Sequence, residues 1–157
     1  LPFRATVLVA SKHERRLFTG LLFRSLGGVF VRRGEPDRKA LRRSLDALQS
    51  GLVLGIAPEG TRSPDHTLQK AKPGAALLAW KTGAAIIPIA AWGQERIFPS
   101  LRQGRRAELH VVFGDPFRLP NAENVTKPSH EQLQKWADLM MTRLAALMPP
   151  EYRGVYG

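Results

Sequence analysis

Ala57-Pro58-Glu59-Gly60-Thr61-Arg62-Ser63 follows directly on an apolar run, Leu52–Ala57, which is bounded by Gly51 and Pro58. A run with almost no polar atoms between such residues predicts a buried strand. A carboxylate, a glycine, a hydroxyl and a guanidinium then stand on consecutive residues. Because ligands of α/β proteins bind in the crevice beyond the strand ends, we interpret this stretch as a binding loop. The alternative is an ordinary β-turn with a solvated Glu–Arg pair.

The composition limits the class of protein and the partners it can have. The chain has 157 residues, of which 43% are hydrophobic and 24% charged, and this suits a single globular domain. It has no cysteine, which excludes disulfides and thiolate metal sites. The net charge of +11 indicates an anionic partner, such as phosphate, nucleic acid or an acidic membrane face. No apolar stretch approaches the roughly 20 residues that a membrane-spanning helix needs.

Strand-like and helix-like patterns alternate along the chain. Apolar or alternating runs predict strands at 5–10, 29–33, 52–57, 85–90 and 107–113. Amphipathic stretches predict helices at 11–26, 37–50, 75–82 and 129–148. The alternation predicts an α/β fold: a single layered domain with a largely parallel central sheet, right-handed crossovers and helices on both faces.

Local signals add detail at the helices. Ser129 with Gln132 forms a capping box at the start of the last predicted helix. Asp37 is placed to cap the second helix, whose inner face we expect to consist of Leu41, Leu45 and Leu48.

The strand from 85 to 90 contains Pro88, which removes one donor from the ladder, so we expect a bulge or an edge strand there. In the strand from 107 to 113, Leu109, Val111 and Phe113 share one face, which is typical of a half-covered strand near the sheet edge.

The segment between these two strands, residues 94–104, has no clear periodicity and is predicted as a loop. We expect its apolar side chains, Ile97, Phe98 and Leu101, to fold back onto the core.

Basic residues near the candidate loop could bind an anion. Arg32 and Arg33 end a strand and point to opposite faces, so at most one of them joins Arg62. An arginine fork matches a phosphate in bidentate fashion. Lys70 and Lys72 precede a predicted helix, whose N-terminus offers free N–H groups. The alternative for each residue is a solvated charge. The arginine-rich surfaces of helices 11–26 and 37–50 are better interpreted as a docking face.

Three blocks in this order resemble those of the glycerolipid acyltransferases, typified by bacterial lysophosphatidic acid acyltransferase. They are Gly27-Gly28-Val29-Phe30-Val31-Arg32-Arg33, then Ala57–Ser63, then Ala85-Ile86-Ile87-Pro88-Ile89. The resemblance covers about Val7 to Gly114. It implies that Arg33 contacts the phosphate of the acceptor and that Glu59, Gly60, Thr61 and Arg62 help to bind the glycerol phosphate. Lys72 matches a basic residue that the family often has before the next helix. Ala57 departs from the Phe or Leu that is more usual there.

The catalytic block of the family, His-x-x-x-x-Asp before the first strand, has no counterpart at that place. In the family its histidine acts as the general base and its aspartate orients the ring. Only His110 with Asp115 has the spacing, and this pair follows the Pro-Glu-Gly-Thr-Arg block, so we do not assign it a catalytic role. We therefore expect residues 1–157 to be an acyltransferase domain that lacks its N-terminal part, and this chain alone to have little activity.

The resemblance implies transfer of a fatty acyl group from acyl-CoA or acyl carrier protein to a lysophospholipid, 1-acylglycerol-3-phosphate, in phospholipid biosynthesis. It implies no metal and no bound cofactor. The expected partners are these substrates, an anionic membrane surface and acyl carrier protein, but no nucleic acid. The expected location is the cytoplasmic face of the cell membrane, as a peripheral protein. The alternatives are a basic nucleic-acid-binding module and a non-catalytic lipid-phosphate binder.

Overall fold

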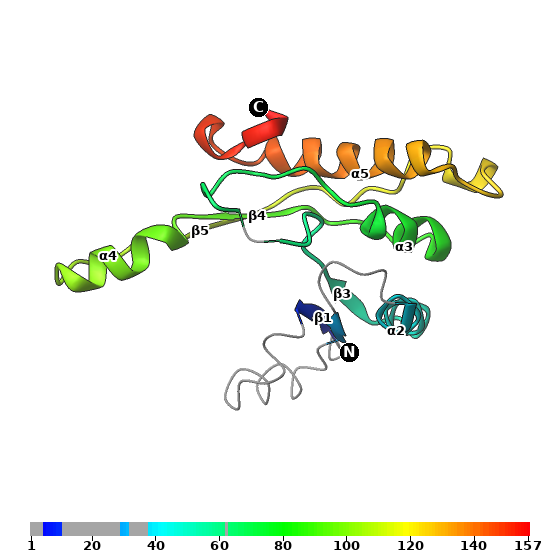
Figure 1. Ribbon diagram of the computed structural model, residues 1–157, viewed down its shortest axis with the longest axis horizontal. Coiled ribbons are helices and arrows are strands. Elements are labelled where there is room, and N and C mark those ends of the chain that lie inside the picture. The colour runs from blue at the N-terminus through cyan, green and yellow to red at the C-terminus, as the bar shows by residue number, and fades with distance from the viewer. Residues whose placement is uncertain (1–4, 11–28, 32–37, 62) are drawn as a thin grey trace.

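A computed structural model describes residues 5–10, 29–31, 38–61 and 63–157 of the chain (Figure 1). Strands β1 (Ala5–Ala10), β2 (Val29–Val31) and β3 (Val53–Gly55) form a three-stranded parallel sheet in the order β2-β1-β3. β2 ends beside Ala10 of β1, whereas β3 ends beside Val7. Their carboxyl ends therefore lie toward the same edge of the sheet but are staggered along β1, by roughly 10 Å at 3.3 Å per residue.

Helix α2 (Arg38–Gln49) lies between β2 and β3 in the chain and contacts both strands. Its most buried side chains are Ala40 and Ser44, at 4% and 1% exposure. Leu41, Leu45 and Leu48, which we predicted as the inner face, are only partly buried. Ser44 can be buried on this face because its Oγ donates to the Ala40 carbonyl at 2.8 Å and so meets its polar requirement within the helix.

The second sheet is antiparallel and pairs β4 (Ile89–Trp92) with β5 (His110–Phe113). The α/β class is confirmed, but the described strands do not form the single, largely parallel sheet that we predicted. Pro88 lies just before β4 instead of within it, and its carbonyl accepts from Gly114 N at 2.9 Å. Beyond it, Ile86 and Phe117 form an isolated antiparallel bridge.

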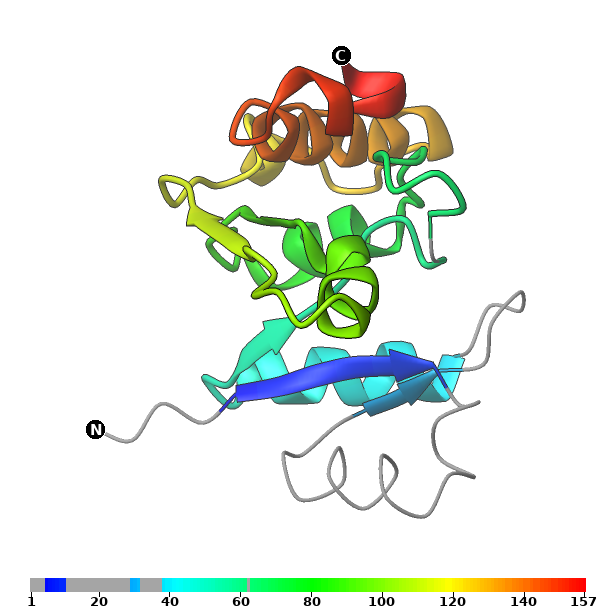
Figure 2. The same cartoon turned by 90° about the vertical axis from the view of Figure 1, so that its left-hand side faces the viewer.

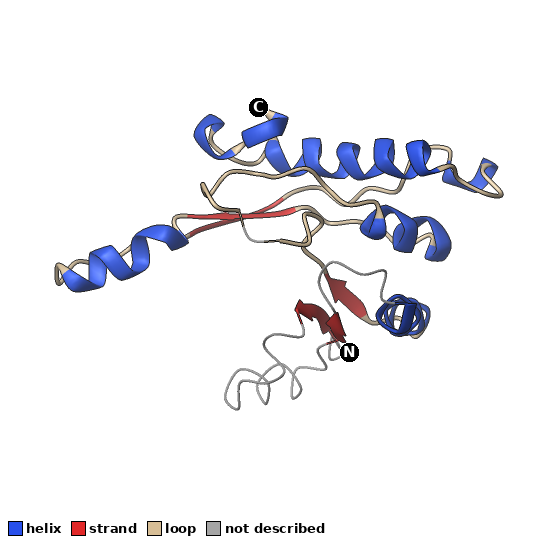
Figure 3. Ribbon diagram, in the orientation of Figure 1, coloured by secondary structure: helices blue, strands red, loops and turns tan. Residues whose placement is uncertain are grey.

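The main hydrophobic core among the described residues lies between helix α3 (Gly74–Thr82), helix α5 (His130–Ala145) and β4 (Figures 2 and 3). It contains small and flexible side chains such as Ala76, Ala137 and Met141, each with no exposed surface. Ser129 caps α5 as predicted, accepting from Gln132 N at 3.1 Å. Three short 3-10 helices complete this half: η3 (Ala122–Asn124), η4 (Pro150–Tyr152) and η5 (Gly154–Tyr156).

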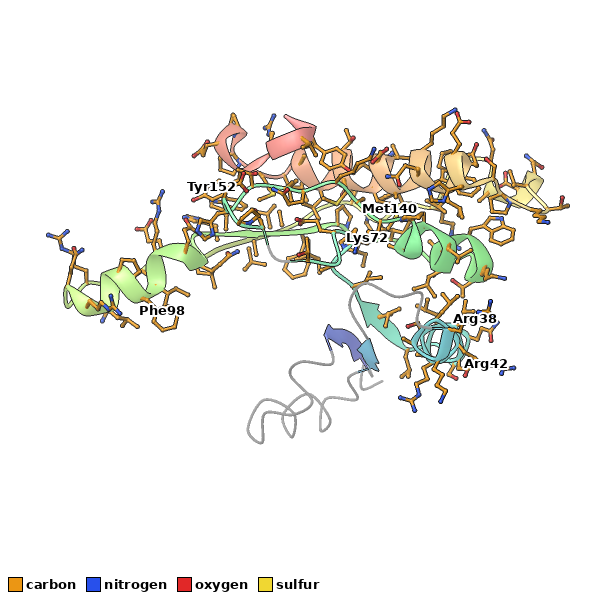
Figure 4. The ribbon with its side chains drawn as sticks, viewed as in Figure 1. Arg38, Arg42, Lys72, Phe98, Met140 and Tyr152 are labelled. Carbon is orange, nitrogen blue, oxygen red and sulfur yellow. The ribbon has the colours of Figure 1, made fainter. Side chains whose placement is uncertain are left out.

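Residues 94–102 form the 3-10 helix η2 (Gln94–Arg96) and helix α4 (Ile97–Arg102), where we predicted a loop. Phe98 and Leu101 are 75% and 64% exposed, so the prediction that they pack onto the core is wrong. A helix this short places residues three apart on one face. Here that face points away from the body of the molecule, as Figure 4 shows for Phe98.

The alternating pattern of β5 suggests that the face with Leu109, Val111 and Phe113 is covered, but the structure covers the opposite face. Val112 pairs with Ala90, which is buried in the core, whereas Leu109, Val111 and Phe113 are all exposed. The apolar face of this two-stranded sheet is therefore the open one.

Among the described residues, no helix has the length and apolar character needed to cross a bilayer. The predicted helix at 11–26, the Asp37 cap and Arg32 lie outside the described residues.

Candidate functional site

The candidate loop leaves β3 at Ile56 and reaches α3 at Gly74. Its first turn is closed by Gly60 N, which donates to the Ala57 carbonyl at 3.1 Å. Its two ends are joined by Lys72 N, which donates to the Pro58 carbonyl at 2.9 Å. The loop therefore brings together the start of the Pro-Glu-Gly-Thr-Arg block and Lys72, although they are far apart in sequence.

Gly60 and Lys72 are in direct contact within this loop. Gly60 has a φ of +65°, and a Cβ placed there would lie 3.2 Å from Lys72 Cδ and 3.5 Å from its Nζ. The ammonium group of Lys72, an exposed residue labelled in Figure 4, thus lies beside the exposed backbone of Gly60. Two of the predicted binding residues are brought together, and together they offer a cation next to an open stretch of backbone.

Glu59 is partly buried on the inner side of the loop. Its Oε2 accepts from Gln69 N at 3.0 Å. Burial raises the pKa of this carboxyl group above its ordinary value of 4.5, the bond from Gln69 opposes the shift, and the negative charge of Asp65 adds to it. Glu59 therefore fastens one part of the loop to another, and its contact with the glycerol phosphate stays a prediction.

One carboxylate oxygen organises the middle of the loop. Asp65 Oδ1 accepts from Ser63 Oγ at 2.7 Å, from Thr67 Oγ1 at 2.9 Å and from Gln69 Nε2 at 3.1 Å. The bonds from Ser63 and Thr67 lower the pKa of Asp65 below 3.8. We did not identify Asp65 or Gln69 from the sequence. The Ser-x-Asp-x-Thr spacing was an available signal, because these residues bond to nearby backbone and side chains in turns.

The C-terminal segment holds the far end of the loop. Leu68 N donates to the Tyr152 carbonyl at 2.9 Å, and Ala71 N donates to the Tyr156 hydroxyl at 2.9 Å. The Tyr156 hydroxyl in turn donates to Asp138 Oδ1 at 2.8 Å. Gln134 Nε2 donates to the Ala71 carbonyl at 3.0 Å. The backbone immediately before Lys72 is thereby tied to α5 and to η5.

The remaining predicted site residues are less defined. Thr61 is exposed. Arg33 and Arg62 lie outside the described residues, so our expectation that Arg33, Glu59, Thr61 and Arg62 converge on one pocket stays a prediction. The parallel pairing of β1 with β2 and β3 supports part of it, since the chain leaves β2 and β3 toward the same edge of the sheet.

His110 makes contacts unlike those of a His–Asp dyad. Its ring stacks on Trp92, with centroids 5.2 Å apart and planes inclined by 12°. Its Nε2 lies 3.9 Å from Glu108 Oε2. Within the described part of the chain it has no contact with Asp115, which is exposed beyond the end of β5. No group of three or more metal-ligating side chains occurs among the described residues either.

The chain matches the family model described as Acyltransferase over residues 2–92, more than half of its length, and it belongs to that family. This confirms the resemblance that the sequence blocks indicated.

Its curated relatives include several enzymes named 1-acyl-sn-glycerol-3-phosphate acyltransferase. The chloroplastic LPAT1 of Arabidopsis thaliana is 30% identical over 73% of this chain, which spans 33% of that relative. The Borreliella burgdorferi protein is 27% identical over 85% of this chain and 57% of its own length. The Bacillus subtilis protein is 22% identical over 94% of this chain and 70% of its own length. The chain thus spans only about a third of the plant relative.

Among solved structures, the fold is similar to that of the LPA acyltransferase PlsC from Thermotoga maritima. The TM-score is 0.64 at 24% identity, over 92% of this chain and 56% of that chain. The likeness establishes a shared fold.

Proposed function

We propose that residues 1–157 form an acyltransferase domain that acts on 1-acylglycerol-3-phosphate. The acyl donor would be the thioester of acyl-CoA or of acyl carrier protein. Membership of the Acyltransferase family supports this proposal, as do the printed names of the relatives. The observation that carries it is the closed loop in which Lys72 lies against Gly60. This loop lies within the matched residues 2–92, and it presents a cation and open backbone to a phosphate.

In this proposal the loop binds the acceptor's phosphate. Lys72 provides a point charge with three rotatable donors, and Gly60 lets a phosphate oxygen approach the main chain because it has no Cβ. Thr61 provides a hydroxyl. Arg33 and Arg62 complete the proposed site as bidentate phosphate ligands. Glu59 and Asp65 keep the loop in shape from within.

The proposed reaction forms an ester and breaks a thioester. The acceptor hydroxyl attacks the thioester carbonyl and loses its proton to a base, and the thiolate leaves and takes up a proton. Such a base commonly contributes about 10²–10⁴-fold. We do not assign this role to His110, because its ring is stacked on Trp92 and has no contact with Asp115 among the described residues.

We also propose that the protein works as a peripheral protein at the cytoplasmic face of a membrane. The proposed acceptor is a membrane lipid, the proposed donors are cytoplasmic, and the net charge of +11 favours an anionic surface. Acyl carrier protein, as an acidic donor, would be attracted by the same charge.

The experiment that tests this function compares two neighbouring lysines. Calorimetric titration with short-chain lysophosphatidate should give a Kd about tenfold higher for Lys72→Gln than for the unchanged chain, because one charge-assisted contact is lost. Lys70→Gln removes the same charge from an exposed residue of the same loop and should change the Kd by less than about twofold. Equal effects of the two variants would contradict the proposed site. Thioester turnover with lysophosphatidate as acceptor tests the reaction separately, and little turnover is expected because no residue of this chain is assigned as the base.

A further inference from the structure

Helix α4 and the residues after it form a projecting, apolar and basic surface that the proposed phosphate site does not use. We call this surface the α4 tip and define it as Arg96, Phe98, Leu101, Arg102, Arg105 and Arg106. All six side chains belong to exposed residues, and Phe98 and Leu101 expose 75% and 64% of their surface. Figure 1 shows α4 extending away from the body of the molecule, beyond the ends of β4 and β5.

The base of the α4 tip is firmly held. Gly93 precedes η2 with a φ of +91°, and a Cβ at Gly93 would lie only 2.4 Å from the Glu108 carbonyl oxygen. The two strands that carry the tip are therefore packed closely where it begins. Glu95 adds a second fastening, since its Oε1 accepts from the Tyr152 hydroxyl at 2.8 Å. The start of the α4 tip is thus held against the body at two points.

The charge of the α4 tip is uniformly positive. Residues 96–107 contain four arginines and no acidic residue. The acidic residues near its base are Glu95, Glu108 and Glu151. Glu95 is bonded to Tyr152 and lies 3.5 Å from Arg96 Nε, and Glu108 lies 3.9 Å from His110 Nε2. These carboxylates lie where the tip joins the body. Glu108 follows Arg106 by two residues, whereas Arg102 has no acidic residue within five positions on either side.

We propose that the α4 tip docks the protein on an anionic lipid surface. Phe98 and Leu101 enter the interface between head groups and acyl chains, and the arginines bind lipid phosphates. Apolar side chains surrounded by Lys or Arg are the pattern by which amphipathic segments lie in a membrane interface. This inference concerns a surface other than the proposed substrate loop, and it holds whether or not that loop binds lysophosphatidate.

The α4 tip is a better candidate for the membrane-docking surface than the basic surface of α2, because it combines positive charge with exposed apolar side chains. Arg38 and Arg42, labelled in Figure 4, and Arg43 are exposed on α2, but no large hydrophobic side chain of that helix is exposed. A charged surface without an apolar anchor is attracted to anionic lipid but is readily released by salt. The arginine-rich surface of helix 37–50, which we expected to be a docking face, therefore serves as the control surface for the α4 tip.

Co-sedimentation with vesicles separates the two surfaces. Vesicles of phosphatidylcholine with phosphatidylglycerol should bind the chain, and vesicles of phosphatidylcholine alone should bind it at least about tenfold less. Arg102→Gln/Arg105→Gln/Arg106→Gln should lower binding about 10²-fold. Phe98→Ser/Leu101→Ser should lower it about tenfold or more. Arg38→Gln/Arg42→Gln/Arg43→Gln removes the same charge from α2 and should lower it by less than about threefold. Undiminished binding of the Phe98/Leu101 variant, or a larger loss from the α2 variant, overturns the proposal.

A fluorescent label at position 101 reports insertion directly, with an apolar dye in place of the leucine and Phe98 left unchanged. The chain has no cysteine, so Leu101→Cys and, as control, Arg42→Cys each provide a single site for an environment-sensitive dye. The label at position 101 should shift to the blue with anionic vesicles, and the label at 42 should not. A shift at both positions, or at neither, contradicts the proposal.

If the α4 tip binds nucleic acid or a second copy of the chain instead of lipid, the experiments give different results. A blue shift at position 101 with a single-stranded oligonucleotide and none with vesicles would assign the α4 tip to nucleic acid. Gel filtration that shows a dimer for the unchanged chain and a monomer for Phe98→Ser/Leu101→Ser would assign it to a second copy. Either result overturns the membrane assignment.

Discussion

The contact between Gly60 and Lys72 restricts which residues can occupy position 60 of the candidate loop. A φ of +65° disfavours any side chain at position 60, and the space beside it is filled by the aliphatic part of Lys72. The absence of a Cβ thus has two effects, one on backbone strain and one on the position of the cation. These effects can be separated, because Gly51 has the first without the second: its φ is +77°, and nothing lies within 4 Å of its Cβ position.

We predict that Gly60→Ala and Gly51→Ala each lower the free energy of unfolding by about 1 kcal/mol, from backbone strain. Only Gly60→Ala should also weaken lysophosphatidate binding, severalfold, because the added methyl group covers the open backbone and displaces the Lys72 side chain slightly. Thermal unfolding and calorimetric titration of both variants measure the two quantities. If Gly51→Ala weakens binding equally, the contact between Gly60 and Lys72 does not matter for the ligand.

Glu59 gives a prediction about pH. Because burial raises its pKa in the folded protein, the folded state binds this proton more tightly than the unfolded state does. Its contribution to stability is therefore complete below about pH 4.5 and is lost as the pH rises through the raised pKa. We expect the unfolding free energy of the unchanged chain, relative to Glu59→Gln, to fall from pH 4 upward.

Glu131 is the control with the opposite sign. A hydrogen bond from Lys135, at 2.7 Å, lowers the pKa of Glu131. Its contribution is present above the ordinary pKa of 4.5 and is lost as the pH falls. Urea unfolding of Glu59→Gln and Glu131→Gln between pH 3 and 7 should give differences that change in opposite directions. The same direction for both would contradict the burial of Glu59.

At the scale of elements, the loop from Pro58 to Lys72 depends on a segment at the other end of the chain. Ala71 and Tyr156 are 85 residues apart, and their hydrogen bond joins the loop to η5. The Tyr156 hydroxyl accepts a hydrogen bond from Ala71 N and donates one to Asp138. Removing that hydroxyl leaves a buried backbone N–H without a partner, since Ala71 is buried.

We predict that Tyr156→Phe lowers the unfolding free energy by about 1–3 kcal/mol and raises the Kd for lysophosphatidate severalfold, because Lys72 follows Ala71 directly. Tyr152→Phe is the matched control. It removes the bond to Glu95 at 2.8 Å, but the carbonyl that accepts from Leu68 stays in place. It should reduce stability without changing the Kd. A Kd that changes equally in both variants would mean that the effect is general loosening of the fold.

The sequence predicts these elements only where the signal is local. The Ser129 cap, the apolar runs that form β1, β2 and β3, and helix α3 follow from residues within a few positions of one another. The direction of β5 does not, because the alternation at 107–113 defines a strand but not its partner. The bond between Ala71 and Tyr156 has no local signal at all. Helix α4 was missed because six residues are too few for a helical period to emerge.

At the scale of the whole molecule, the net charge of +11 will attract any polyanion, so attraction alone does not distinguish a lipid phosphate from nucleic acid. The surroundings of the three tryptophans argue against a role in stacking on nucleic-acid bases. Trp136 is buried, Trp80 donates to the Val125 carbonyl at 3.0 Å, and Trp92 is stacked on His110. Among the described residues, Phe98 is an exposed aromatic residue on a helix flanked by arginines, and the label at position 101 reports on the surroundings of that helix.

Salt separates the two kinds of binding. Affinity for a duplex falls with salt in proportion to the number of phosphates neutralised, with a slope of about −0.9 per phosphate on logarithmic axes. If four or more arginines contact an oligonucleotide, raising the salt from 50 to 500 mM should weaken binding by about 10³-fold or more. Lysophosphatidate carries one phosphate, so its binding should weaken by about tenfold or less. Lysophosphatidylcholine, whose phosphate is masked by a cation, serves as the control and should bind more weakly at every salt concentration.

We therefore predict that at 500 mM salt lysophosphatidate still raises the midpoint of thermal unfolding and that an oligonucleotide does not. At a ligand concentration of 100 times Kd the stabilisation is about 2.7 kcal/mol, which for a chain of this size corresponds to a shift of roughly 5–10 °C. Lys72→Gln should reduce this shift, because the salt-resistant part of the binding resides in the loop. An oligonucleotide that protects equally at 500 mM salt would mean that contacts other than charge hold nucleic acid, and the acyltransferase proposal would then lose its ligand.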